Sequence, residues 1–192
     1  MLGDAFKSPF STEGDFKMGG DIHSFAEVKN AQTGKWEKVG EVFPLDEYDR
    51  KACNKEFGDS PFDWRSYSMY GFLAGVRNYS HCEPLSEPKG LPDDLSPEVA
   101  KEAEEWAGDG HSHSWLTLKE LLAFDYDKTF RDKRVTKQVA PDFWNDAALA
   151  EEGEGAHVTY RERLGEPFFR ALEVLKTLGE PENVRVVFWF DN

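Results

Sequence analysis

The sequence predicts an α+β protein in which a small mixed or antiparallel sheet packs against helices and long loops. Three observations predict this class. Residues 21–29 and 35–42 are strand-like segments joined by a turn at residues 30–34, so together they make a β-hairpin. Residues 184–190 are β-branched or aromatic at nearly every position, which is typical of a central strand buried on both faces. Helical patterns lie between these strands and predict the layer that covers the sheet.

The helical patterns come with recognisable end signals. Residues 67–76 are apolar enough for a buried helix. The next helix begins at Ser96, an N-cap residue that is followed by proline and glutamate, and it ends near Gly108. Thr117 and Glu120 have the spacing of a capping box, which predicts a further helix start.

The rest of the chain completes this outline. Residues 167–178 repeat apolar side chains on one face of an amphipathic helix. Residues 43–61, 80–97 and 125–157 are polar or rich in Pro and Gly, so we expect irregular loops there, with a short turn of helix around Phe143 and Trp144. The predicted organisation is one α+β domain over residues 18–192, preceded by an irregular N-terminal arm over residues 1–17.

Composition limits the classes of function. The 192 residues include 37 acidic and 23 basic side chains, a net charge of -14, and such a surface repels phosphate backbones. General nucleic-acid binding is therefore disfavoured. The two cysteines, Cys53 and Cys82, do not make a disulfide framework, and no apolar run reaches the length of a membrane span. We expect a cytoplasmic protein without membrane contact, and assembly into a homo-oligomer stays open.

Two polar stretches are the candidate site. Asp21 and His23 share one face of the first predicted strand. Asp109, His111 and His113 lie in a glycine-flanked turn over residues 108–115, just before a predicted helix. If the fold brings both stretches together, three imidazoles and the Asp21 carboxylate suit a divalent transition metal such as Zn, Mn, Fe or Ni. The alternative is that His23 is an ordinary strand residue and the other two imidazoles brace a turn by hydrogen bonds.

Several motifs resemble a family of small proteins from bacteriophages and bacteria, whose N-terminus reads Met-Gly-Cys-Asp-Ile-His. The motif Met-Gly-Gly-Asp-Ile-His occupies residues 18–23 here, and the likeness continues at residues 73–78, 90–94 and 109–115 and at the terminal Val-Phe-Trp-Phe-Asp-Asn. The resemblance covers most of the chain from Met18 and implies a phage context, hence the cytoplasm of a host cell, but no activity. Gly20 stands where the family pattern has Cys, so that thiol is not required here.

A second resemblance is local. Gly-Asp-x-His at residues 20–23 and Gly-His-x-His at residues 110–113 are similar to the first and last motifs of calcineurin-like metallophosphoesterases. That family's middle motifs, Gly-Asp-x-x-Asp and Gly-Asn-His, are absent. The motif likeness implies metal-dependent hydrolysis of a small phosphate-containing molecule, such as a nucleotide or cyclic nucleotide. In this hypothesis His23, His111 and His113 bind the metal, Asp21 binds or bridges it, and Asp109 acts as base or orients a histidine.

Two other functions stay open. Phage proteins often sequester the signalling nucleotides of host defence, and a nucleotide-binding protein without chemistry needs aromatic faces and cations. The faces come from Trp64, Tyr67, Tyr70 and Trp115, and the cations from Arg65, Arg77 and Lys89. In both ligand hypotheses Arg77, Tyr70, Trp115 and Lys89 are the substrate-binding candidates. The last function is that of a virion or assembly component tethered by the N-terminal arm.

Overall fold

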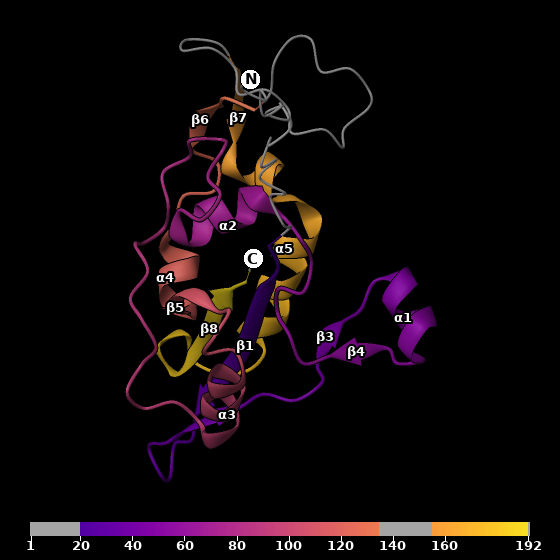
Figure 1. Cartoon of the computed structure of the whole chain (residues 1–192), viewed down its shortest axis with the longest axis vertical. Helices are drawn as coiled ribbons and strands as arrows, with labels where there is room; N and C mark the ends of the chain where they lie inside the picture. Colours follow the sequence, from indigo (N-terminus) through magenta and orange to yellow (C-terminus); the bar gives the residue numbers. More distant parts are fainter. Residues whose placement is uncertain (1–19, 135–154, 192) are drawn as a thin grey trace, which may run out of the picture.

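The computed structural model describes residues 20–134 and 155–191 (Figure 1). Its main sheet has four antiparallel strands in the order β2-β1-β8-β5. Their bounds are Ile22–Lys29 (β1), Trp36–Lys38 (β2), His111–Thr117 (β5) and Val184–Phe190 (β8). Two short ladders join β3 (Phe43–Pro44) to β4 (Phe57–Gly58) and β6 (Thr129–Asp132) to β7 (Ala156–Thr159). The helices are α1 (Glu47–Cys53), α2 (Tyr67–Ala74), α3 (Pro97–Glu105), α4 (Leu118–Ala123) and α5 (Tyr160–Lys176), with a 3-10 turn at Pro181–Asn183. The α+β class is confirmed.

Strand β8 is the centre of the sheet, as its composition predicts. All seven of its residues are buried, and β1 and β5 pair with its two edges. Residues directly opposite each other on antiparallel strands share a face. His23 lies opposite Trp189 and Glu27 opposite Arg185 on one face, whereas Ala26 faces the other side together with Val186. The two faces therefore have different character, one apolar and one mixed.

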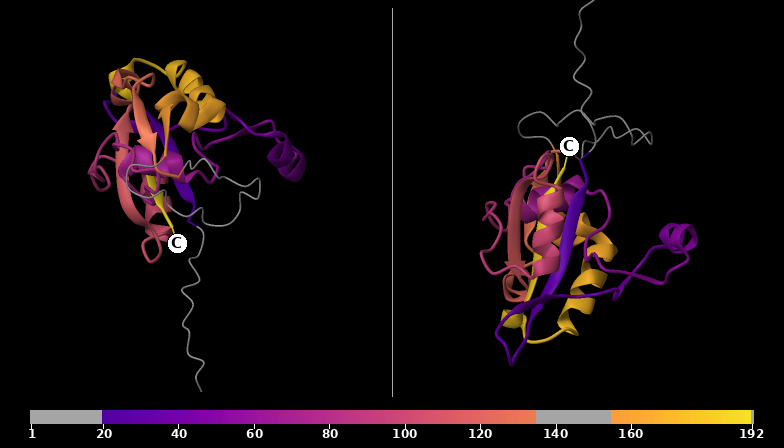
Figure 2. Two further views of the ribbon diagram at one scale, coloured as in Figure 1. Left: turned by 90° about the horizontal axis from the view of Figure 1, so that it is seen from above. Right: turned by 60° about the horizontal axis from the view of Figure 1, so that its bottom comes forward.

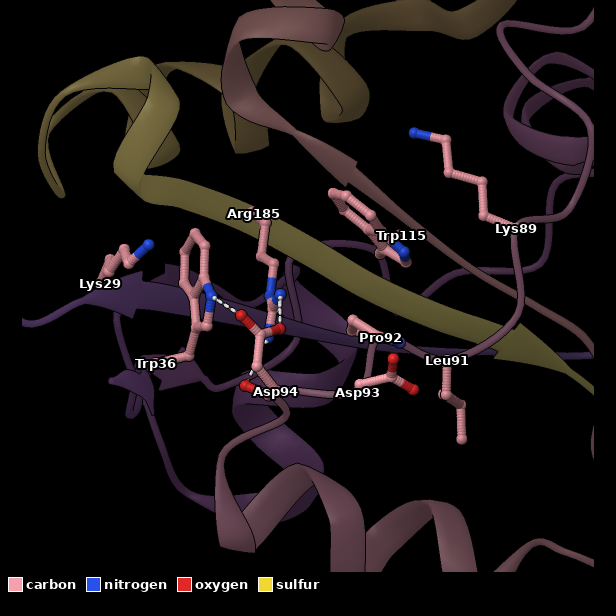
Figure 3. A pocket seen from close by; sticks show the side chains of 9 residues that line it. All are labelled: Lys29, Trp36, Lys89, Leu91, Pro92, Asp93, Asp94, Trp115 and Arg185. Carbon is pink, nitrogen blue, oxygen red and sulfur yellow. Dashed lines mark hydrogen bonds and ion pairs between the residues drawn. The ribbon is translucent and has the colours of Figure 1, made fainter. Parts of the chain in front are cut away.

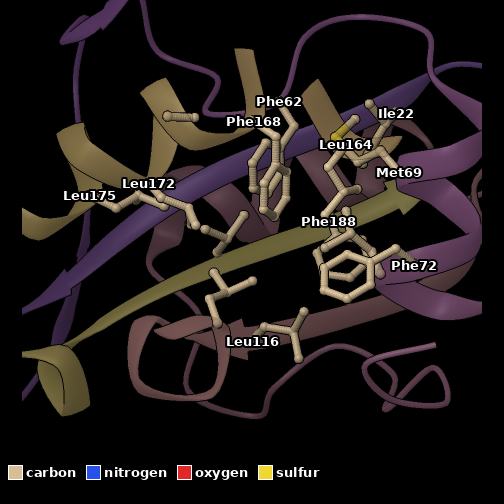
Figure 4. Packing of buried hydrophobic residues seen from close by; sticks show 14 of the residues in the cluster. Ile22, Phe62, Met69, Phe72, Leu116, Leu164, Phe168, Leu172, Leu175 and Phe188 are labelled. Atoms are coloured by element: carbon tan, nitrogen blue, oxygen red, sulfur yellow. The ribbon is translucent and has the colours of Figure 1, made fainter. Parts of the chain in front are cut away.

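The apolar face packs against α2, α4 and α5 and forms the main core (Figures 2 and 4). Helix α2 is apolar on nearly every side, and it buries six of its eight residues. The amphipathic part of α5 directs Phe168, Leu172 and Leu175 onto the sheet, and the Phe168 ring stacks on Phe62 with centroids 5.2 Å apart. Burial of each such side chain stabilises the folded state by roughly 1.5–3 kcal/mol.

The mixed face carries α3 and a smaller apolar cluster. Val99 and Ala103 of α3 pack against Phe25, Val187 and Trp189. The helix begins as predicted, because the Ser96 side chain accepts a hydrogen bond from the backbone N–H of Val99. Polar residues lie on this face on both sides of the cluster, and they form the two candidate sites described below.

An arm formed by β3, α1 and β4 leaves the body of the molecule (Figure 1). None of the residues of α1 is buried, and Tyr48 is 78% exposed. Local contacts hold the helix: Asp46 caps its start by accepting from the N–H of Asp49, and Asn54 ends it with φ 54°. The prediction that residues 43–61 are irregular is therefore wrong, since short-range capping is enough to form this element.

Three other expectations need correction. Residues 111–117 form a strand, not a turn, because the backbone groups along the second edge of β8 require hydrogen-bonding partners. The segment 125–157 was expected to be loop, but its described parts contain β6 and the start of β7. The helix predicted over residues 167–178 belongs to α5, which begins earlier, at Tyr160, and is broken at Gly165, where φ is 75°. The predicted helix starts at Tyr67 and at the Thr117–Glu120 capping box are confirmed.

Some predictions fall outside the described residues. These are the N-terminal arm over residues 1–17 and the helical turn around Phe143 and Trp144. Within residues 20–134 and 155–191, none of the helices has the length and apolar character needed to cross a bilayer.

Candidate functional site

The sheet brings the two predicted histidine stretches to the same end of β8. His23 on β1 and His113 on β5 lie on opposite sides of Trp189, with ring centroids 5.9 Å and 5.7 Å from the indole. The backbone at Gly110 can lie close to Trp189 and His113 because glycine has no side chain. A Cβ at this position would lie 3.1 Å from Trp189 Cδ1 and 3.4 Å from His113 Nε2. An indole ring therefore separates the two imidazoles.

His23 has partners of its own. The centroid of its ring lies 3.9 Å from the ring centroid of Trp106. Its Nε2 donates a hydrogen bond to Asp191 Oδ2 at 3.0 Å. Asp191 Oδ1 also accepts from the backbone N–H of Asp21 at 2.7 Å. Burial would raise the pKa of Asp191, but these two donors outweigh it and hold the pKa below its ordinary value. The imidazole is thus fixed by an ionised carboxylate.

The two predicted catalytic aspartates lie apart from this arrangement. Both oxygens of Asp21 accept from Arg65, at 2.8 Å each, and the two side chains are 52% exposed. Asp109 is exposed on the loop before β5. Neither carboxylate joins the imidazoles in the arrangement that the sequence hypothesis requires.

His111 lies on the other side of the sheet from His113. A β-bulge between His111 and Ser114 places two residues against one on β8, and Ser112 takes φ 51° within it. The His111 ring therefore lies near Phe190, with centroids 6.1 Å apart, and its Nδ1 hydrogen bonds with Ser112 Oγ at 3.0 Å. Its Nε2 is buried and has no hydrogen-bond partner among the described residues.

The electrostatics of His113 suit a neutral imidazole. Burial lowers the pKa of His113, and the neighbouring His111 lowers it further. A neutral imidazole can bind a metal, but among the described residues no three His, Cys, Asp or Glu side chains gather closely enough to do so. The metal assignment, and the Zn, Mn, Fe or Ni that it implies, stays a prediction.

Of the predicted ligand-binding residues, Tyr70 and Arg77 lie beside the start of β1. Tyr70 is buried, and burial raises the pKa of its hydroxyl, which donates to the carbonyl of Gly20 at 3.4 Å. The Arg77 guanidinium lies 5.2 Å from the centroid of Tyr67. A Cβ at Gly20 would lie 3.0 Å from Arg77 Nε and 2.8 Å from the carbonyl of Asp191, so this backbone arrangement suits glycine.

The other two, Trp115 and Lys89, line an open groove of about 650 Å³ on the mixed face of the sheet (Figure 3). We call it the Trp36–Trp115 groove. Its lining is Lys29, Trp36, Lys89, Leu91, Pro92, Asp93, Asp94, Trp115 and Arg185. These residues come from all four strands and from the loop before α3. Its volume lies in the range of small-molecule sites.

Cations and indoles alternate along the groove. The order is Lys29, Trp36, Arg185, Trp115 and Lys89. Arg185 lies 4.0 Å from the ring centroid of Trp36 and 5.9 Å from that of Trp115. The terminal ammonium groups lie 5.7 Å from Trp36 and 4.6 Å from Trp115. Each contact is a cation–π interaction, worth about 0.5–1 kcal/mol when exposed and more when desolvated.

The three cations differ in how firmly they are held. Arg185 is 2% exposed and donates to Glu27, which is fully buried, at 2.7 Å. Lys89 forms an ion pair with Glu120 at 2.6 Å. Because this pair is partly exposed, it contributes little to stability. No carboxylate among the described residues forms an ion pair with Lys29. Arg185 is therefore part of the floor, whereas both lysines can turn toward a ligand.

Sequence reasoning did not find Lys29, Trp36 or Arg185. A signal for the last was present: Arg185 is the one charged residue in an otherwise apolar predicted strand, and burial of a charge requires a partner. Glu27 lies on a strand that was predicted to belong to the same sheet, and the structure places it directly opposite Arg185. Trp36 carried no comparable signal, because a tryptophan on a hairpin strand is equally typical of a core.

Comparisons with models of protein families, with curated proteins and with solved structures found no match to this chain. The resemblance to the phage and bacterial family rests on the motifs given above and stays a prediction.

Proposed function

We propose that this protein binds a small ligand that combines a planar aromatic group with a phosphate group, such as a nucleotide, in the Trp36–Trp115 groove. Binding without catalysis is the form of this function that the groove supports best. The observation that carries it is the alternation of indole rings and cations along one open groove, in a chain whose net charge is -14. An aromatic ring can stack on an indole, and phosphate oxygens attract ammonium groups.

The arrangement suggests how the ligand lies. Trp115 is half-buried on the edge strand β5 and offers the more accessible ring, whereas Trp36 is 8% exposed and packs against Arg185. A base on Trp115 places its phosphates within reach of Lys89, which can exchange Glu120 for the ligand. Lys29 at the far end would receive a second anionic group. The cost of this exchange is small, because the Lys89–Glu120 pair is partly exposed.

The test is titration calorimetry with ATP, ADP-ribose and a cyclic dinucleotide. Trp115→Ala should weaken binding about 5- to 150-fold, since stacking of a base on an aromatic side chain contributes about 1–3 kcal/mol. Lys89→Ala should weaken binding and reduce its salt dependence. Lys119→Ala is the matched control, because Lys119 also pairs with a glutamate, Glu182 at 3.0 Å, on another surface. Equal affinity of the wild type and Trp115→Ala, or no binding of any of the three ligands, would refute the proposal.

A second measurement separates binding from hydrolysis. The protein is incubated with the ligand that binds, then denatured, and the released molecule is analysed by mass spectrometry. Intact ligand supports a sequestering protein. Fragments would support the metal-dependent hydrolysis predicted from the sequence, and their formation should then depend on His23, His111 and His113.

A further inference from the structure

Asp94 holds an unusual position in the Trp36–Trp115 groove (Figure 3). Its Oδ1 accepts from Arg185 Nη1 at 2.6 Å, and its Oδ2 accepts from Trp36 Nε1 at 2.9 Å. Its backbone carbonyl accepts from Arg185 Nη2 at 3.0 Å. The guanidinium is 2% exposed, but the Asp94 side chain is 63% exposed. An exposed carboxylate thus covers two buried donors.

The two donors form a cradle for an anion. Glu27 holds Arg185 at its Nε, and Trp36 stacks on the guanidinium, so Nη1 and the indole N–H point toward one place. A guanidinium donor together with a neutral N–H donor suits two oxygens of one carboxylate or phosphate. The carboxylate found there belongs to the chain itself.

We propose that Arg185 and Trp36 form a phosphate-binding subsite of the groove, which Asp94 occupies in the absence of ligand and leaves when a ligand phosphate enters. This inference rests on the proposed function, because it assigns a phosphate of the ligand to the middle of the same groove, beside Trp36. The Asp94 backbone contact with Arg185 does not involve the side chain. Rotation of the side chain alone therefore frees both donors, and the loop before α3 keeps its place.

An internal competitor lowers the apparent affinity for the ligand by the fraction of time for which the subsite is open. If Asp94 occupies the subsite for about nine-tenths of the time, its removal raises the affinity for phosphate about tenfold. Removing any nearby acid also raises the affinity by weakening general repulsion. The control must therefore remove one charge from the same loop without touching the donors, and Glu87, which is exposed outside the groove, meets this condition.

The experiment compares wild type, Asp94→Ala and Glu87→Ala by calorimetry, with inorganic pyrophosphate and with ATP as probes. We expect Asp94→Ala to bind both about tenfold more tightly than wild type, and Glu87→Ala to gain less than about threefold. Adding Arg185→Lys to Asp94→Ala should abolish the gain, because an ammonium cannot replace the planar fork. Circular dichroism checks that each variant is folded, and Asp94→Asn offers a second, less disruptive substitution.

The outcomes separate this inference from the proposed function. ATP binding to wild type with no greater gain for Asp94→Ala than for Glu87→Ala overturns the subsite and leaves the groove function standing. Weaker binding by both Asp94 variants also overturns it, since Asp94 would then assist the ligand. Absence of pyrophosphate and ATP binding in every variant overturns the subsite, and the groove function falls with it when ADP-ribose and the cyclic dinucleotide also fail to bind.

Discussion

Loss of the buried Glu27–Arg185 ion pair should strongly destabilise the fold. Glu27 is fully buried, with Oε2 accepting from Arg185 Nε at 2.7 Å and Oε1 accepting from the backbone N–H of Ser96 at 2.7 Å. Glu27→Gln keeps the side-chain size but leaves the guanidinium with Asp94 as its remaining acidic partner. Removing one member of a buried pair costs about 3–5 kcal/mol, because the other charge stays desolvated. We expect a loss of this size in the free energy of unfolding.

The assay is urea denaturation followed by circular dichroism, on wild type, Glu27→Gln, Arg185→Met and the double variant. The double variant should lose less than the sum of the two single losses, with a coupling of about 2 kcal/mol or more, because neither charge is then left alone. Asp127→Asn, in the exposed pair with Arg161, is the control and should leave stability unchanged within error. A loss below about 1 kcal/mol for Glu27→Gln, or additive losses, would refute this account of the groove floor.

Three further predictions address the sheet end near Trp189. If the metal hypothesis is right, protein purified without a histidine tag contains a stoichiometric transition metal, measured by mass spectrometry. The double substitution of His111 and His113 by Ala should remove this metal. Absence of bound metal under every loading condition would count against the hypothesis. The pKa of His113 is lowered on folding, so its contribution to stability is present above about 6.5, the unfolded pKa, and is lost as the pH falls through the folded pKa. Melting curves between pH 7.5 and 5 should therefore fall more steeply for wild type than for His113→Gln, and parallel curves would contradict the shift. Gly110→Ala places a Cβ 2.9 Å from the carbonyl of Trp106 and should cost about 1–3 kcal/mol in urea denaturation, whereas Gly108→Ala, with open space around it, should be tolerated.

Local patterns in the sequence predicted the elements whose causes are local. Ser96 caps α3 and Thr117 begins α4 as expected, because a cap depends on residues three positions apart. The strand at residues 111–117 was missed because its cause is not local. It forms along an edge of β8 that becomes available only in the folded sheet.

The candidate site shows the same division. The hypothesis from the sequence was that the fold brings the stretches of His23 and His113 together. Both imidazoles lie beside Trp189, but the sequence could not reveal that this indole lies between them. The groove is harder still to predict, because its lining comes from four strands and one loop. Trp115 and Lys89 were identified as ligand-binding candidates from their chemistry alone, and their position in the groove agrees with that hypothesis without testing it.

The strand order has a consequence for how the chain folds during synthesis. β1 and β5 do not pair with each other; each pairs with β8, whose residues lie more than 150 positions after those of β1. Until residues 184–190 have left the ribosome, the sheet lacks its middle, and two strands wait with unpaired edges. Contacts of such long sequence separation also form slowly. Unpaired strand edges of this kind make a nascent chain prone to aggregation while translation proceeds.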